Sequence, residues 1–346
     1  MALNSSGPMS LAGPTVGQSI QLELGGTGSS TISLNDANVR SLLGVASGTI
    51  AFSNAYGKSA GPTAVSYTYT TSTQNASLDI TTISGYNAGN SAVTITINSG
   101  IYLWSSSTAT PGLTLIGGSG SDTVTLVNNG YICGMGGKGG TTSAAGSPGG
   151  TALKLGINTT VNNTNASAYI GGGGGGGAGF KSTGGGGAGG GAGGDRPGYG
   201  SGGAGGAIGT GGGNATLLPF PVSGPDDAGK SSFGGGGGRV FPGTGGAGGA
   251  TPTTTAKGGT SGGGGGMNYT PNNAGNTGQG FAGGSAASAG SGSSGTAGGG
   301  GGGGWGAAGG AAGSFAGGAG GKAVDLNTKT ITWTSGNTTR VYGTVA

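Results

Sequence analysis

Residues 171–194 read GGGGGGGAGFKSTGGGGAGGGAGG, and this stretch decides which folds are open to the chain. Around it, 69 of the 151 residues from Gly171 to Gly321 are glycine. Glycine loses more backbone entropy on folding than any other residue, and it has no side chain to bury. The region is therefore either a flexible linker or a fold that requires the Cβ atom to be absent.

The composition favours the ordered alternative. Charged residues make up only 6% of the chain, whereas solvated low-complexity tracts usually carry more charge. The glycine blocks are also interrupted by aromatic residues, for which a linker has no use: Phe180, Tyr199, Phe220, Phe233, Phe241, Tyr269, Phe281, Trp305 and Phe315. Ordered polyglycine forms an extended helix of three residues per turn, without internal hydrogen bonds. We therefore predict a bundle of polyglycine II-type helices, antiparallel where short loops join them, whose backbone groups bond to neighbouring chains.

The remaining sequence is predicted to be mostly β, with almost no α-helix. In residues 1–60, an alternating pattern predicts strands at 19–24 and 48–53, and a short helix is predicted at 37–43, which Asn35 or Asp36 can cap. Residues 61–133 contain six segments rich in β-branched and aromatic residues: 65–70, 76–83, 92–97, 101–104, 113–116 and 124–132. This spacing predicts a small sandwich or jelly-roll-like β-strand module.

A weak internal repeat lies on either side of the densest glycine blocks. Residues 149–155 (GGTALKL) and 320–326 (GGKAVDL) share a Gly-Gly-x-Ala-[Leu/Val]-x-Leu pattern, and a strand-like segment follows each. We expect these to be ribbons that bracket the glycine bundle and close it at both ends, with chance similarity in a biased sequence as the alternative. The predicted glycine-rich region thus spans residues 134–325, and a C-terminal strand segment spans residues 326–346.

Charge and cysteine content exclude several classes of function. The net charge is +4, but the 12 Lys and Arg residues are scattered singly, so we expect no nucleic-acid partner. The lone Cys133 rules out a disulfide framework within the chain and a zinc finger. No signal peptide is visible, and no stretch approaches the roughly 20 apolar residues needed to cross a membrane. We expect a soluble protein made in a cytoplasm.

Chemistry suited to catalysis is sparse. The chain has no histidine, and only Asp226 and Asp227 are adjacent among its eight carboxylates. A glycosidase pair drawn from distant loops and a cation site at Asp226-Asp227 remain alternatives, with a solvated turn favoured over the cation. We predict no enzymatic activity, no catalytic residues, no metal and no cofactor.

The N-terminal sequence resembles the segment shared by many tail proteins of tailed bacteriophages. The stretches that carry this resemblance are SLAG (10–13), GQSIQLEL (17–24), ISLNDANVR (32–40), LGVASG (43–48) and YGKS (56–59). In that family the segment serves as an anchor. The resemblance therefore implies that residues 1–60 attach to phage tail or baseplate proteins.

The glycine-rich region resembles the distal adhesins of T-even-like phages. Those proteins alternate glycine-rich motifs with variable loops, fold the motifs into a sandwich of polyglycine helices and bind bacterial outer-membrane receptors with the loops. Here the glycine-rich blocks are residues 171–179, 184–194, 198–213, 234–249, 258–266 and 298–310. Unlike those adhesins, which are separate caps on a fibre tip, this chain carries its own anchor-like segment. The resemblance therefore implies a whole short fibre, and fibres of this kind are commonly homotrimers.

We interpret the chain as a phage tail fibre or adhesin of the virion, assembled in the host cytoplasm, that recognises an outer-membrane protein or polysaccharide. The candidate receptor-binding residues lie in or beside interruptions of the glycine pattern: Phe220, Asp226, Asp227, Met267, Asn268, Tyr269, Phe281 and Trp305. Aromatic loop residues supply contact area at low entropic cost. The alternative for the rings is burial at the ends of the bundle. Two alternatives for the protein are a structural tail or baseplate decoration and an antifreeze-like bundle.

Overall fold

The chain divides into two compact units. The first comprises residues 1–67, 79–95 and 117–125, and the second comprises residues 68–78, 96–116 and 126–346. The computed structural model describes the following residues: 2–180, 183–195, 200–201, 203–207, 216–217, 236–238, 289–290, 298–334 and 340–346. This part of the chain is mostly β with few helices, as predicted.

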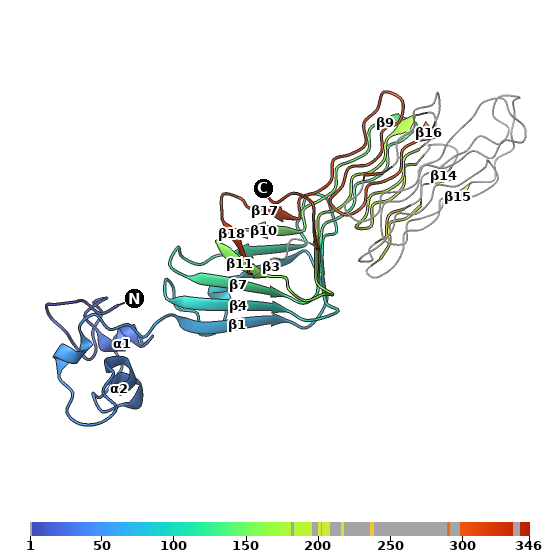
Figure 1. Ribbon diagram of the computed structural model, residues 1–346. Helices are drawn as coiled ribbons and strands as arrows, with labels where there is room; N and C mark the ends of the chain where they lie inside the picture. Colours follow the sequence, from blue (N-terminus) through green and yellow to red (C-terminus); the bar gives the residue numbers. More distant parts are fainter. Residues whose placement is uncertain are drawn as a thin grey trace, which may run out of the picture. The chain divides into compact units, whose positions relative to one another are not determined.

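Residues 2–60, in the first unit, form short helices around a small apolar core (Figure 1). Helix α1 (Ile20–Glu23) begins after Ser19, whose hydroxyl accepts a hydrogen bond from the Leu22 N–H. Helix α2 (Ala37–Leu43) ends at Gly44, which has a left-handed φ of 73°. The 3₁₀-helix η1 spans Phe52–Ala55. The buried core residues are Leu3, Ile20, Val39, Leu42, Leu43 and Ala55.

Local hydrogen bonds explain where the predictions for this segment fail. The helix at 37–43 is confirmed, but the carboxylate of Asp36 accepts from the Ser33 N–H and does not cap it. The predicted strand at 19–24 is wrong, because Ser19 caps a helical turn there. The predicted strand at 48–53 is also wrong: the Asn54 side chain accepts from the Ala51 N–H and supports the 3₁₀-turn η1.

Three larger sheets hold most of the β-structure. Their strand orders are β1-β4-β7-β11-β18, β3-β6-β10-β17 and β2-β5-β8-β12-β19. Every register that the structure describes within them is parallel. The bounds are β1 Thr63–Tyr69, β2 Thr73–Gln74, β3 Ala76–Asp79, β4 Ser91–Ile97, β5 Tyr102–Trp104, β6 Leu113–Ile116, β7 Thr123–Asn128, β8 Tyr131–Cys133, β10 Leu153–Leu155, β11 Thr159–Asn162, β12 Tyr169–Gly171, β17 Val324–Asp325, β18 Ile331–Trp333 and β19 Val341–Tyr342, with the 3₁₀-helix η2 at Ile80–Thr82.

The backbone winds as a coil through these sheets. One pass runs through β4, β5 and β6, the next through β7, β8 and β10, and the third through β11, β12 and β17. Equivalent residues of consecutive passes lie side by side, so that Leu103, Ile132 and Ile170 occupy matching positions and are all fully buried. This is a parallel β-solenoid. The predicted sandwich or jelly-roll is therefore wrong, because those folds are built from antiparallel strands.

The glycine-rich sequence is inserted into this coil at one recurring place, the link from the third sheet to the second. In consecutive passes the link is formed by residues 105–112, by residues 134–152 (the first insertion) and by residues 172–323 (the second insertion). The repeated segments at 149–155 and 320–326 consequently pair with each other, Leu153 with Val324 and Lys154 with Asp325. The expectation that they bracket the bundle at opposite ends is wrong. They are equivalent strands of neighbouring passes, which explains the repeat.

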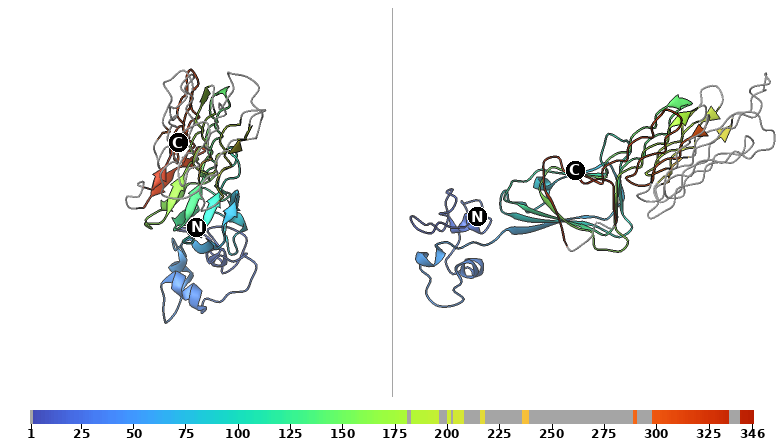
Figure 2. Two further views of the ribbon diagram at one scale, coloured as in Figure 1. Left: turned by 90° about the vertical axis from the view of Figure 1, so that its right-hand side faces the viewer. Right: turned by 45° about the horizontal axis from the view of Figure 1, so that its top comes forward.

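Within the insertions, extended stretches called here the glycine segments run side by side (Figures 1 and 2). The described glycine segments are residues 134–140, 146–150, 171–178, 184–188, 191–194, 299–304, 307–310 and 316–321. Consecutive segments joined by short turns are antiparallel, as predicted. For example, Gly194 donates to Gly184 and Gly191 donates to Gly187, across a turn in which Gly189 has a φ of 95°.

Hydrogen bonds around residues 171–178 repeat every three residues. Consecutive N–H groups from 173 to 178 donate in turn to three neighbours, with donor–acceptor distances of 2.8–2.9 Å, so that each neighbour receives every third donor. These three neighbours are residues 147–150, 185–188 and 307–310. Carbonyl groups of the same segment accept from three others, residues 134–140, 300–303 and 318–321. One glycine segment is therefore bonded to six neighbours, and its backbone groups are satisfied without any sheet.

Side chains have no room between these neighbours. A Cβ atom on Gly176 would collide with the carbonyl oxygen of Lys138, and one on Gly187 would collide with that of Gly174. Alanine fits at selected places such as Ala178 and Ala188, both fully buried. The close backbone packing explains why the sequence is so rich in glycine.

Candidate functional site

The described glycine segments have two ends, and aromatic residues mark both. At one end, called here the base, the segments join the solenoid strands β8, β10, β12 and β17. At the other, called here the outer end, the described segments end at residues 141–145, 179–180, 298–299 and 311–316. Figure 1 shows β9 (Ser143–Ala144) and β16 (Gly298–Gly299), which belong to the outer end, well away from β10 and β17.

Trp305 fills the base. Its side chain is fully buried and packs with Cys133 of β8 and with Ala188 of a glycine segment. Partly buried aromatic residues surround this cluster: Tyr102, Trp104, Tyr131, Tyr169 and Tyr342. Trp305 therefore anchors the insertions to the solenoid, and its ring offers no surface to a receptor. The sequence left open whether the aromatic interruptions contact a receptor or are buried, and Trp305 is buried.

The tyrosines at the base form a ladder along the third sheet. Tyr102, Tyr131 and Tyr169 occupy matching register positions in β5, β8 and β12, and their rings stack with centroid separations of 4.3 Å and 6.1 Å. Tyr342 continues the stack at 6.0 Å. Burial, followed by the proximity of Tyr131 and Cys133, raises the pKa of Tyr102 to about 12. Tyr102 is therefore uncharged at neutral pH. Ring stacking along the ladder stiffens the base.

A small antiparallel sheet forms part of the outer end. Strand β13 (Gly179–Phe180) pairs with β9 (Ser143–Ala144) on one side and with β16 (Gly298–Gly299) on the other. A second antiparallel pair, β14 (Gly200–Ser201) with β15 (Thr216–Leu217), lies within the second insertion. In the first of these sheets Ser143 is exposed, and Ala144 and Phe180 are partly exposed.

Two phenylalanines form an aromatic pair at the outer end. The rings of Phe180 and Phe315 have centroids 6.4 Å apart, are tilted by 40°, and are both partly exposed. Reciprocal hydrogen bonds of 2.9 Å between Ala312 and Phe315 close the turn that carries one ring. Gly313 in that turn has a φ of 55°, and a Cβ atom there would lie 2.7 Å from Phe180 Cγ, so only glycine brings the turn this close.

The described polar residues of the outer end are uncharged. Thr141, Ser143 and Ser314 are exposed, and no residue of the outer end as defined above is charged. Below it, Lys138 of the first insertion forms an ion pair with Asp195 of the second, with the two side chains 50% and 44% exposed. An exposed pair of this kind adds little stability. It does join the two insertions near the end where the aromatic pair lies.

The comparison with known families identifies the chain. Residues 64–242, more than half of the chain, match the family described as phage tail fibre adhesin Gp38. The chain belongs to this family. The resemblance of the glycine-rich region to phage adhesins is thereby confirmed, and residues 1–60, predicted to be an anchor, lie outside the matched residues.

Comparisons with individual proteins add little to the family assignment of this adhesin. No curated protein matches it. Among solved structures, the crystal structure of the gp37-gp38 adhesin tip complex of the bacteriophage S16 long tail fibre matches with 19% sequence identity and a TM-score of 0.40. That match covers 97% of this chain and 100% of the other.

Most of the receptor-binding candidates predicted for the adhesin lie outside the described residues. These are Phe220, Asp226, Asp227, Met267, Asn268, Tyr269 and Phe281, together with the cation site considered at Asp226-Asp227. Phe180 and Phe315 were absent from the candidates, although both interrupt glycine-rich sequence. Their signal was the same as that of Trp305, and only the structure separates an outer ring from a buried one.

The described part of the chain contains no group of three or more His, Cys, Asp or Glu side chains placed to hold a metal ion. It also contains no helix with the length and apolar character required for a membrane span.

Proposed function

We propose that this adhesin recognises a host cell-surface receptor, an outer-membrane protein or polysaccharide, through the outer end of its glycine segments. The observation that carries the proposal is the Phe180–Phe315 pair, held by a closed turn and a hydrogen-bonded strand on a rigid backbone lattice. Rings fixed before binding lose little entropy on contact. The family supports an adhesive role.

The lattice is proposed to be a bundle of polyglycine II-type helices. The three-residue period of donors along residues 173–178 supports this assignment, because an extended helix with three residues per turn points successive N–H groups at three neighbours. Six hydrogen-bonded neighbours around residues 171–178 are consistent with hexagonal packing of such helices. A lattice held by its backbone tolerates changes in the turns, which suits a surface whose specificity must change.

Residues 1–60 are proposed to attach the adhesin to phage tail or baseplate proteins, and the virion is its proposed site of action. Their own apolar core, separate from the strands of the solenoid, supports a distinct role for this segment. Exposed Phe52 and Tyr56, 39% and 37% accessible, offer apolar contact area there. A homotrimer is proposed as the assembly, and the mass of the purified protein in solution tests it.

A structural decoration without receptor contact is the alternative. The burial of Trp305 favours it to a limited degree, since aromatic residues in this sequence can serve packing alone. Unlike Trp305, Phe180 and Phe315 remain partly exposed. Cell binding separates the two functions.

The first test measures binding of purified, fluorescently labelled adhesin to host cells. We expect the native protein to bind and a Phe180→Ala/Phe315→Ala variant to bind at least about tenfold more weakly, as expected when aromatic hot-spot residues are truncated. Replacing residues 214–233 or 267–282 should change the range of cells bound. Tyr67→Ala is the matched control, because it removes an exposed aromatic ring far along the chain from these turns. Its binding should equal that of the native protein.

Two results would count against the proposal. If the native protein fails to bind cells to which the virion adsorbs normally, the protein is a structural part. If the double variant and both loop replacements bind like the native protein, the receptor contacts neither the outer end nor these two sequence segments.

A further inference from the structure

The last described residues, 340–346, touch both ends of the second insertion. At its start, the Gly172 N–H donates to the Tyr342 carbonyl at 2.9 Å, beside the parallel pairing of β12 with β19. At its end, the N–H groups of Ala323 and Val324 both donate to the Thr344 carbonyl, at 2.9 Å and 3.2 Å. One short segment thus holds together Gly172 and Ala323, which are 151 positions apart in the sequence.

The same segment interlocks with a turn inside the insertion. Gly306 donates to the Gly172 carbonyl at 2.7 Å and has a φ of 65°. A Cβ atom on Gly306 would collide with the backbone of Gly343, which itself has a φ of 116°. A Cβ atom on Gly343 would lie 2.6 Å from the Gly321 carbonyl oxygen and 2.7 Å from the Ala323 nitrogen. Only a pair of glycines permits this approach.

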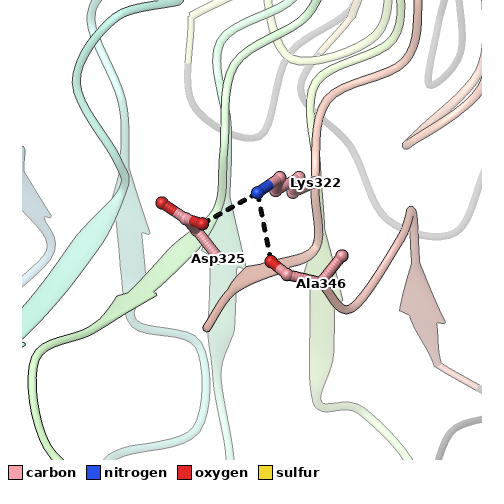
Figure 3. Close-up of polar contacts among 3 residues, drawn as sticks. All are labelled: Lys322, Asp325 and Ala346. Carbon is pink, nitrogen blue, oxygen red and sulfur yellow. Dashed lines mark hydrogen bonds and ion pairs between the residues drawn. The ribbon is translucent and has the colours of Figure 1, made fainter. Parts of the chain in front are cut away.

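Side chains fasten the segment on both sides. Arg340 donates through Nε to the Ala168 carbonyl at 2.9 Å and through Nη2 to the Asn163 carbonyl at 2.8 Å. Lys322 lies between Asp325 Oδ1 at 2.8 Å and the Ala346 carbonyl at 3.1 Å (Figure 3). The Tyr342 ring packs in the aromatic cluster that encloses Trp305.

We propose that residues 340–346 form a clasp that holds the second insertion closed at its base. Closing a loop of this length costs conformational entropy, and glycine-rich chain loses more than most. The hydrogen bonds of the clasp offset this entropy loss at the two points where the loop begins and ends. We therefore expect the glycine segments to keep their register only while the clasp is closed. Opening is then a local event that unpairs β19 and frees the insertion, and it leaves the other solenoid strands paired.

This inference goes beyond the proposed function and is tested without any receptor. Amide hydrogen exchange is compared between the native protein and Gly343→Ala, which places a methyl group against Gly321 and Ala323. We expect exchange of residues 173–178 to become at least about tenfold faster, while Leu103 and Ile132 in β5 and β8 remain protected. Arg340→Ala, which removes two side-chain hydrogen bonds, should act in the same direction with a smaller effect, and it serves if Gly343→Ala does not fold.

Gly100→Ala is the matched control. Gly100 also has a left-handed φ, 76°, but a Cβ atom there meets nothing within 4 Å, so this variant carries the backbone strain without the collision. It should leave exchange of residues 173–178 unchanged. The inference is overturned if the clasp variants expose residues 340–346 while residues 173–178 stay protected. Equal acceleration of exchange at residues 173–178, Leu103 and Ile132 would also overturn it, since opening would then be global.

Discussion

At the scale of single residues, Asp122 shows how one buried carboxylate can organise a turn. It accepts hydrogen bonds from the Tyr86 hydroxyl at 2.6 Å, the Ser119 N–H at 2.8 Å and the Ser91 N–H at 3.0 Å. Burial raises the pKa of Asp122, but these hydrogen bonds outweigh burial and lower it below the ordinary value. Burial, with the hydrogen bond to Asp122, raises the pKa of Tyr86 to about 12.

Because of Asp122, we expect the stability of the first unit to fall at acid pH. A carboxylate whose pKa is lowered by folding stabilises the protein above its unfolded pKa of about 4, and this stability is lost as the pH falls through the folded pKa. Asp122→Asn should reduce the free energy of unfolding by about 1–3 kcal/mol at pH 7 and flatten its decline below pH 4. Denaturant titrations from pH 7 to pH 2 measure both effects. Parallel curves for the native protein and the variant would contradict this role.

The residue type alone does not determine whether an aromatic ring is buried or exposed. Trp305 and Phe315 both follow or interrupt glycine runs, yet one is fully buried at the base and the other is partly exposed at the outer end. The difference depends on which end of a glycine segment carries the ring. That in turn depends on the solenoid strands to which the segments connect, a property that no local pattern encodes.

At the scale of elements, the strands were predictable and their partners were not. Predicted strands at 92–97, 101–104 and 113–116 match β4, β5 and β6 to within a residue or so. Their β-branched and aromatic content is a local signal. The partner of each strand belongs to the next pass of the coil, as Leu103 of β5 pairs with Ile132 of β8. The strand sequences alone were therefore equally consistent with an antiparallel sandwich.

The close packing of the glycine segments predicts that added side chains destabilise the protein. Gly176→Ala places a methyl group against the Lys138 carbonyl, and overpacking of this kind should destabilise the protein by about 1–3 kcal/mol or more. Gly120→Ala is the matched control, because a Cβ atom there meets nothing within 4 Å and its backbone is not left-handed. Thermal unfolding compares the two. Equal midpoints would mean that residues 171–178 are not tightly packed.

At the scale of the whole molecule, the composition predicted an ordered glycine bundle and the resemblance predicted the family, which the family match confirms. The sequence did not indicate that the bundle is inserted into a solenoid. The only trace was the repeat at 149–155 and 320–326, whose residues pair directly because they are equivalent strands of consecutive passes. Because the second insertion separates these two strands widely in the sequence, the repeat suggested that they close opposite ends of the glycine bundle. In the structure they lie side by side at its base.

The most direct test of the central claim is inhibition of phage adsorption by the purified adhesin. Host cells are incubated with saturating native protein or with the Phe180→Ala/Phe315→Ala variant, and adsorption of the virion is then measured. If the outer end contacts the receptor, the native protein should reduce adsorption at least about tenfold and the variant should not. Normal adsorption in the presence of saturating native protein would contradict the claim.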